Sequence, residues 1–175
     1  MQFNNVIIAA AGSGKTTLII NHALKQKDKK ILILTYTLFN LEQIKQKIIN
    51  KVGVIPKNLH VQSWFSFLLK HCVRPYQNFI YEKKRIENIQ FENGKSVPFV
   101  KMSDIEKYYF KNKTKIYTDK ISLFACKCNE SSRNLVINRL EKIYDYIYID
   151  EIQDLAGYDF DLLRLMFNSN IKINV

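Results

Sequence analysis

The stretch YIYIDEIQD, residues 146–154, carries the carboxylates of this chain that are best placed to do chemistry. Its apolar first half suits a buried strand, and Asp150, Glu151 and Asp154 follow directly, with Gln153 among them. Anions at the edge of a hydrophobic core are costly unless something positive meets them there. The stretch therefore predicts a site in which carboxylates face a cationic group or a metal ion.

A glycine-rich stretch near the N-terminus predicts the partner of these carboxylates. Residues 9–16 follow the phosphate-loop pattern G-x-x-x-x-G-K-[ST], except that Ala9 stands in place of the first glycine. The glycines let the backbone turn its N–H groups toward phosphate oxygens, and a helix beginning near Lys15 adds its positive end. The residues expected to bind the nucleotide are Ala9, Ala10, Ala11, Gly12, Ser13, Gly14, Lys15, Thr16 and Thr17.

Taken together, the two stretches predict a site for ATP and Mg²⁺. We expect Lys15 to contact the β- and γ-phosphates, and Thr16 and Asp150 to ligate the Mg²⁺. Glu151 is expected to position or deprotonate the attacking water. Each stretch alone has a plainer explanation, a chance glycine-rich turn or a solvated turn after a strand, and their joint occurrence favours the nucleotide site.

The elements around these stretches predict an α/β fold with a parallel sheet sandwiched by helices. The apolar runs are continuous, not alternating, which is typical of strands buried on both faces. Strands and helices alternate along the chain, as they do in α/β domains. Strands are expected over residues 4–10, 31–37, 60–63, 144–150 and 171–175, and helices over 17–26, 40–49, 64–73, 138–145 and 158–167.

Residues 75–130 differ from the rest of the chain and are rich in Lys, Asn and Tyr. The string ENGKSVP, residues 92–98, favours a turn or a hairpin. We expect this segment to be an insertion or small subdomain. The ATPase domain would then comprise residues 1–74 and 131–175.

Composition and charge narrow the class of protein. The 175 residues are 47% hydrophobic, which is ample for one packed domain. The net charge is +11, yet residues 143–175 carry 2 basic and 6 acidic side chains, so the excess of positive charge lies elsewhere. This distribution suits a polyanion-binding protein, although a lysine-rich surface also arises in AT-rich genomes. Three cysteines without an even disulfide framework fit a cytoplasmic protein, and no apolar run reaches the roughly 18 residues of a membrane span.

Four strings of the sequence resemble, in order and context, motifs I, Ia, Ic and II of superfamily 1 helicases of the UvrD/Rep kind. They are AAGSGKTT, LTYTLFNLEQIKQKI, VQSWFSFL and YIDEIQDL, and the resemblance leaves out only residues 75–140. Alanine is common at the first loop position of that family, which accounts for Ala9. The resemblance implies a RecA-like P-loop NTPase fold, with Gln153 near the γ-phosphate and Asp154 in a structural role.

The same resemblance implies contacts with single-stranded DNA from the motif Ia and Ic positions. These positions are Thr35, Tyr36, Thr37, Ser63, Trp64 and Phe65. Phe65 replaces the usual histidine of the motif, so no role of that histidine is transferred. The alternative to DNA contact is that Trp64 and Phe67 belong to the hydrophobic core.

The resemblance implies an ATP-dependent DNA helicase or translocase that moves 3′ to 5′. Residues 171–175 are expected to form a strand between the phosphate-loop strand and the Asp150–Glu151 strand, and to expose a sheet edge or an apolar face. The second RecA-like domain of the family, which supplies arginines to the ATP site, is absent from this chain, so the chain alone is expected to be inactive. The alternatives are a repair or phage-defence ATPase without unwinding activity, and a nucleotide-switched DNA-sensing or regulatory module.

Overall fold

The central sheet of the protein is parallel throughout in the computed structural model, which describes residues 4–5, 14–92 and 94–175. Its strand order is β2-β1-β6-β7. The strands are β1 (Ile31–Thr35), β2 (Leu59–Ser63), β6 (Tyr146–Ile149) and β7 (Lys172–Asn174). The continuous apolar runs thus form parallel strands, as predicted, and all five residues of β1 are buried.

Strand β7 lies between β6 and the N-terminal segment that leads to the phosphate loop. On one side it pairs with β6, and on the other Asn5 forms a parallel bridge with Asn174. The Asn5 amide donates to the Ile173 carbonyl at 3.0 Å, and the Val175 amide donates to the Asn5 carbonyl at 3.0 Å. The predicted place of residues 171–175 is confirmed. The expected exposed apolar face is wrong, because Ile171, Ile173 and Val175 are buried. The predicted strand over residues 4–10 lies, beyond Asn5, outside the described residues.

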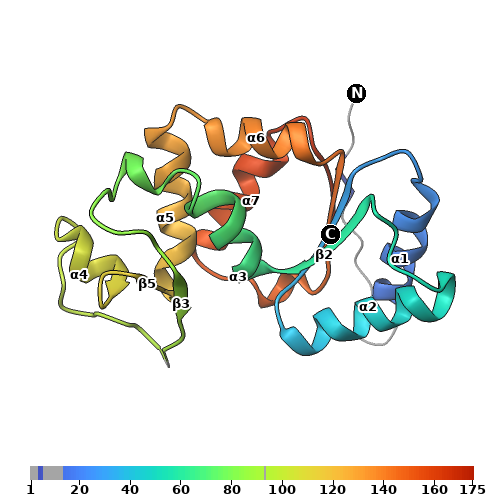
Figure 1. Ribbon diagram of the computed structural model, residues 1–175, viewed down its shortest axis with the longest axis horizontal. Coiled ribbons are helices and arrows are strands. Elements are labelled where there is room, and N and C mark those ends of the chain that lie inside the picture. Colours follow the sequence, from blue (N-terminus) through green and yellow to red (C-terminus); the bar gives the residue numbers. More distant parts are fainter. Residues whose placement is uncertain (1–3, 6–13, 93) are drawn as a thin grey trace.

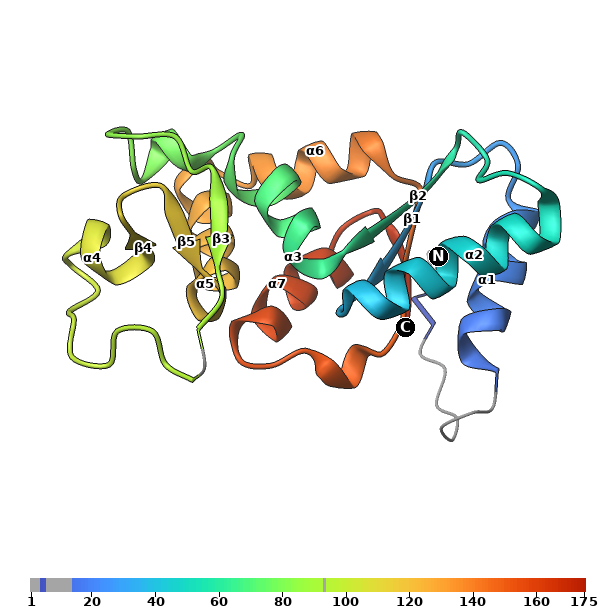
Figure 2. The same ribbon diagram turned by 60° about the horizontal axis from the view of Figure 1, so that its bottom comes forward.

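Helices cover both faces of the central sheet (Figures 1 and 2). Because neighbouring residues of a strand point to opposite faces, Ile31 and Ile33 of β1 join one hydrophobic cluster, and Leu32 and Leu34 join the other. The first cluster includes residues of α1 (Lys15–Lys25) and α2 (Leu38–Val52). The second includes residues of α5 (Thr118–Ser131), α6 (Leu135–Ile143) and α7 (Tyr158–Phe167). The α/β sandwich is confirmed.

The helix predicted over residues 64–73 divides into two kinds of helix. A short α-helix, α3 (Trp64–Phe67), is followed by a π-helix, η1 (Leu68–Val73). Five of the six side chains of η1 are buried, so this helix is enclosed on almost every side. Widened π turns of this kind are rare, and they occur frequently near functional sites.

Residues 75–130 form a second, smaller sheet, which lies at the opposite end of the molecule from α1 and α2 (Figure 1). Its order is β3-β5-β4, from β3 (Asn88–Gln90), β5 (Lys115–Tyr117) and β4 (Phe110–Lys111). The short helices η2 (Gln77–Phe79) and α4 (Ile105–Tyr109) accompany it. Helix α5 packs against α7 and η1 and so joins this part to the central sheet. Whether residues 75–130 are a separate domain stays a prediction.

Of the two alternatives predicted for residues 92–98, a turn or a hairpin, the hairpin is wrong, whereas Gly94 with a φ of 84° and a turn from Pro98 agree with the turn. Strand β3 pairs in parallel with β5, and the antiparallel pair of this sheet is β4 with β5. The described part of the 92–98 stretch contains no strand. Turn chemistry in ENGKSVP predicts a reversal, but the strand that pairs with β3 comes about twenty-five residues later, which turn residues cannot specify.

Candidate functional site

The site is built around Asp150, which follows the last residue of β6. Its backbone N–H donates to the Leu34 carbonyl at 2.9 Å, so the residue continues the pairing of β6 with β1. The residue is only 4% exposed. Burial raises the pKa of its carboxyl above the ordinary value, because removal from water disfavours the charged form, while the Thr16 hydroxyl opposes this effect.

A hydrogen bond joins the two predicted halves of the site. The Thr16 hydroxyl, in the first turn of α1, donates to Oδ2 of Asp150 at 2.8 Å, across 134 positions of sequence. Gly14 directly precedes α1 with a φ of 87°, a left-handed conformation that glycine adopts readily. Residues Ala9, Ala10, Ala11, Gly12 and Ser13 of the predicted loop lie outside the described residues, and Thr17 is exposed on α1.

The residues that meet here suit a magnesium ion. Oδ1 of Asp150 is buried and has no hydrogen-bond partner among the residues that the structure describes. The Thr16 hydroxyl lies at the other oxygen of the same carboxylate. The described residues contain no group of three or more His, Cys, Asp or Glu side chains that could enclose a metal. One carboxylate with one hydroxyl is the sparse set that Mg²⁺ takes when phosphates and water complete its octahedron.

Glu151 and Gln153 lie beside Asp150. Both line a hollow of about 40 Å³ together with Asp150 and Lys15. Gln153 donates a side-chain hydrogen bond from Nε2 to Oε2 of Glu151. Glu151 itself has a φ of 60°, in the left-handed region, which costs a non-glycine residue roughly 1–2 kcal/mol. Strain of this kind is found at functional sites, where surrounding structure holds a side chain in a required direction.

The motif Ia and Ic residues meet at the carboxyl ends of β1 and β2, where Thr35 pairs with Ser63. Both of these residues are buried. Ser63 accepts a hydrogen bond from the Ser66 amide at the start of α3, and Thr37 accepts one from the Asn40 amide at the start of α2. Capping bonds of this kind fix where each helix begins. Ser63 and Thr37 therefore have a structural role in starting these helices, whether or not they also contact DNA.

Trp64 is a core residue in this structure. It is 1% exposed, and its indole N–H donates to Oδ1 of Asp159 at 2.8 Å. Phe67 is buried beside it, with ring centroids 5.7 Å apart. Of the two predictions for Trp64, the structure therefore agrees with the core position, because an enclosed indole presents no face on which a base can stack.

Tyr36 and Phe65 remain partly exposed and contact each other edge to face, with ring centroids 5.0 Å apart. Phe65 also contacts Phe91, which is 66% exposed, at 5.7 Å. We refer to Tyr36, Phe65 and Phe91 as the aromatic surface. Phe91 was missed by sequence reasoning, because it lies in the inserted segment and belongs to no motif. An adjacent hollow of about 310 Å³ is lined by Tyr36, Phe65 and residues that include Ser122, Ala156 and Asp159.

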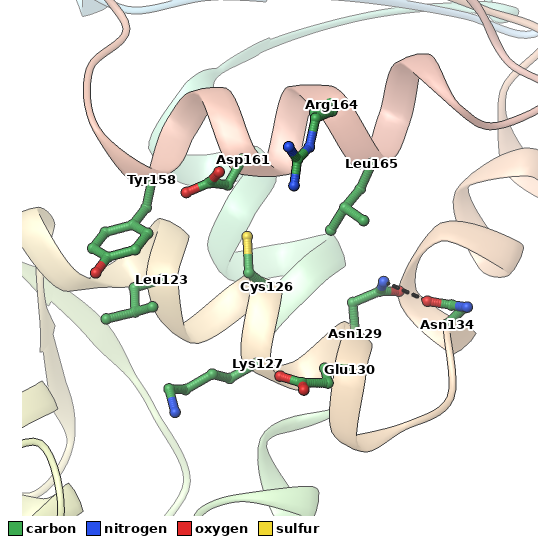
Figure 3. Close-up of a pocket in the computed structure, with 10 residues that line it drawn as sticks. All are labelled: Leu123, Cys126, Lys127, Asn129, Glu130, Asn134, Tyr158, Asp161, Arg164 and Leu165. Carbon is green, nitrogen blue, oxygen red and sulfur yellow. Dashed lines mark hydrogen bonds between the residues drawn. The ribbon is translucent and has the colours of Figure 1, made fainter.

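A further hollow, of about 440 Å³, lies between α5 and α7 (Figure 3). Figure 3 shows Cys126 on α5 directed toward α7, with Asp161 and Arg164 on the facing helix. Burial raises the pKa of the Cys126 thiol to about 12, so the thiol is protonated at neutral pH and is a weak nucleophile. Within the described part of the chain, no helix combines the length and the apolar character that crossing a bilayer requires.

Comparison with protein families finds a match over much of this chain. The family model described as UvrD/REP helicase N-terminal domain matches residues 1–122. The matched range includes Lys15, Thr16 and the aromatic surface, and it stops before Asp150. No curated protein matches the chain.

Proposed function

The chain belongs to the UvrD/REP helicase N-terminal domain family, and from this premise we propose that it is the ATP-binding motor domain of a DNA helicase or translocase. ATP hydrolysis at Asp150 and Glu151 would drive movement on single-stranded DNA, in the 3′ to 5′ direction that the family resemblance implies. The observation that carries the proposal is the 2.8 Å hydrogen bond between Thr16 and Asp150. It joins the residues that the two halves of an ATP–Mg²⁺ site require.

Each side chain of the site has a proposed task. Lys15 binds the β- and γ-phosphates, and residues 9–14 hold the phosphates by backbone N–H groups. Thr16 and Asp150 would hold a Mg²⁺, which when bound neutralises charge on the phosphate oxygens. Glu151 orients the attacking water and accepts its proton, while Gln153 fixes one carboxylate oxygen of Glu151.

We propose that a second RecA-like domain completes the site. The hollow around Lys15, Asp150 and Glu151 has a volume of about 40 Å³, whereas pockets for small molecules and cofactors usually have about 300–1,000 Å³. A hollow of this volume is too small for a nucleotide, which supports a contribution from residues that do not line it, such as those of a facing domain. An arginine from a facing domain increases phosphoryl-transfer rates by about 10³–10⁵-fold in related enzymes.

The aromatic surface, with the positive net charge of +11, supports single-stranded DNA as the proposed partner. Tyr36 and Phe65 come from two adjacent strand ends and present partly exposed rings. Aromatic side chains bind bases of any sequence by stacking, while lysines and arginines bind the backbone phosphates. Binding of this kind is tolerant of sequence and weakens steeply with salt.

A pair of variants tests the proposed division of roles at the ATP site. Titration with a fluorescent ATP analogue and Mg²⁺ should show loss of binding for Lys15→Ala, because the variant lacks the side chain proposed to contact the phosphates. Glu151→Gln should bind normally, yet reduce turnover by about 10²–10⁴-fold in protein that includes the second domain. Lys25→Ala, in the last turn of α1, is the matched control and should behave as wild type.

If Glu151→Gln loses affinity as severely as Lys15→Ala, the division of roles is wrong. A regulatory switch is the competing function, and it predicts nucleotide binding without any response to DNA. Measurement of turnover with and without an oligonucleotide distinguishes the two functions.

A further inference from the structure

Asp159 is a buried carboxylate that the proposed hydrolysis does not use. It lies in the first turn of α7 and is 8% exposed. Its Oδ1 accepts hydrogen bonds from the Trp64 indole at 2.8 Å and from the Ser122 hydroxyl, and its Oδ2 accepts from the Ala156 amide at 3.0 Å. None of the ion pairs found among the described residues includes Asp159. Neutral donors and the positive end of α7 therefore stabilise its charge.

The three donors belong to three separate parts of the molecule. Trp64 is the first residue of α3, Ser122 lies on α5 of the inserted segment, and Ala156 lies in the loop that follows Asp150. Hydrogen bonds to a buried charge are stronger than those between neutral groups. A displacement of any one part therefore acts on the other two through a single carboxylate.

The segment of residues 151–157, which includes the short 3₁₀ helix η3 (Ile152–Asp154), connects the ATP site to this carboxylate. It begins at Glu151, with a φ of 60°, and ends at Gly157, with a φ of 55° and a ψ of −123° that only glycine adopts readily. Between these two unusual positions, Leu155 is buried, and the Ala156 amide is bound by Asp159. A change at Glu151 or Gln153 thus reaches Ala156 within a few residues.

On the other side, the carboxylate is connected to the aromatic surface. Trp64 is held by Asp159 and is followed directly by Phe65. Phe65 contacts both Tyr36 and Phe91, at ring distances of 5.0 and 5.7 Å. The indole held by Asp159 is thus one residue away from the ring that contacts Tyr36 and Phe91.

We propose that Asp159 is a positioning residue that couples the nucleotide site to the aromatic surface, so that bound nucleotide changes the affinity for single-stranded DNA. The inference rests on the proposed function of both sites. The residue lies between the two sites and acts by holding Trp64 and Ala156 at the same carboxylate. By linkage, DNA changes the nucleotide affinity by the same factor, which for coupled sites is about 5–150-fold.

The test measures the dissociation constant of a fluorescent oligo-dT by anisotropy, with and without Mg²⁺ and a non-hydrolysable ATP analogue. Wild-type protein should show a ratio of the two constants that differs from one by about fivefold or more. Asp159→Asn should bring the ratio close to one. The variant places an amide donor against either the Ala156 N–H or the Trp64 N–H, so one of these contacts must break.

Ser122→Ala is the matched control. It removes a buried hydrogen bond at the same carboxylate but leaves the Trp64 and Ala156 contacts in place. We expect it to keep the wild-type ratio. Trp64 is also the only tryptophan of the chain, so its emission reports directly on the contact with Asp159. Nucleotide should change this emission in wild type and in Ser122→Ala.

The outcomes separate this inference from the function on which it rests. Wild-type protein that includes the second domain and binds neither nucleotide nor oligonucleotide overturns the proposed function together with the inference. If wild-type protein binds both ligands and the ratio of the two dissociation constants is one, the inference alone is overturned. The same holds if Asp159→Asn keeps the wild-type ratio, or if Ser122→Ala brings the ratio close to one. If Asp159→Asn does not fold, Trp64→Phe removes the indole donor together with part of the ring, and an unchanged ratio in that variant overturns the coupling.

Discussion

Asp150 should lower the stability of the protein in the absence of ligand, and Asp150→Asn tests this directly. The side chain is 4% exposed, and its Oδ1 has no hydrogen-bond partner within the described ranges. The substitution preserves the shape of the side chain and removes its charge. It also keeps an oxygen that can accept the hydrogen bond from Thr16.

The size of the effect follows from the unpaired oxygen. A buried acceptor without a partner costs about 1–3 kcal/mol, and more when it is charged. The new amide leaves a neutral donor unpaired instead, so part of this cost remains. We expect Asp150→Asn to raise the free energy of unfolding by about 1 kcal/mol at pH 7, which for a chain of this size raises Tm by about 2–4 °C.

The pH dependence of the difference has a definite sign. Burial raises the pKa of Asp150 in the folded protein above its unfolded value. The folded state therefore holds the proton more tightly, and this stabilising contribution is present below the unfolded pKa and lost as pH rises through the folded pKa. The advantage of Asp150→Asn should be largest near neutral pH and should shrink as pH falls toward the ordinary Asp value of about 3.9.

Thermal unfolding followed by circular dichroism, between pH 4 and pH 8 without divalent ions, measures this difference. Addition of Mg²⁺ and ATP should raise Tm for wild type and leave Asp150→Asn unchanged. Asp145→Asn is the control at the other end of β6, where the carboxylate is partly exposed, accepts from the Lys30 amide and pairs with Lys29. We expect Asp145→Asn to leave Tm unchanged. A lower Tm for Asp150→Asn than for wild type at pH 7, or an advantage independent of pH, would refute the reasoning.

Further predictions concern the same site and the core around it. Thr16→Val should lower stability by about 1 kcal/mol in denaturant titrations, because it removes the hydroxyl that donates to the buried carboxylate, and should weaken the Mg²⁺ dependence of nucleotide binding. Trp64→Ala should lower the free energy of unfolding by about 3–5 kcal/mol in the same titrations. Glu151→Gly should raise Tm, because glycine relieves a left-handed conformation worth about 1 kcal/mol, while steady-state turnover falls. Phe65→Ala should weaken oligo-dT binding by about 1–3 kcal/mol in anisotropy titrations, with an unchanged salt slope, because a ring contributes stacking and no charge.

The sequence by itself was sufficient to predict the parallel sheet and the Thr16–Asp150 pair. Strands buried on both faces must be apolar throughout, so their pattern is visible without knowledge of their partners. The chemistry of the nucleotide requires Thr16 and Asp150 to reach the same Mg²⁺, so it predicts that they lie close together, and a hydrogen bond joins them across 134 positions. The place of residues 171–175 beside the Asp150–Glu151 strand was implied by the family resemblance, and β7 does pair with β6.

Only the tertiary structure decided which of the aromatic side chains are exposed. Trp64 and Phe65 are neighbours at the start of one helix, and nothing local distinguishes them. The indole is enclosed because Asp159, 95 residues later, accepts its N–H, while Phe65 turns to Tyr36 and to Phe91 of the inserted segment. The pairing of β3 with β5 could not be predicted from the sequence for the same physical reason. Contacts between distant segments depend on how complete elements pack, and the residue types at either end are compatible with many such packings.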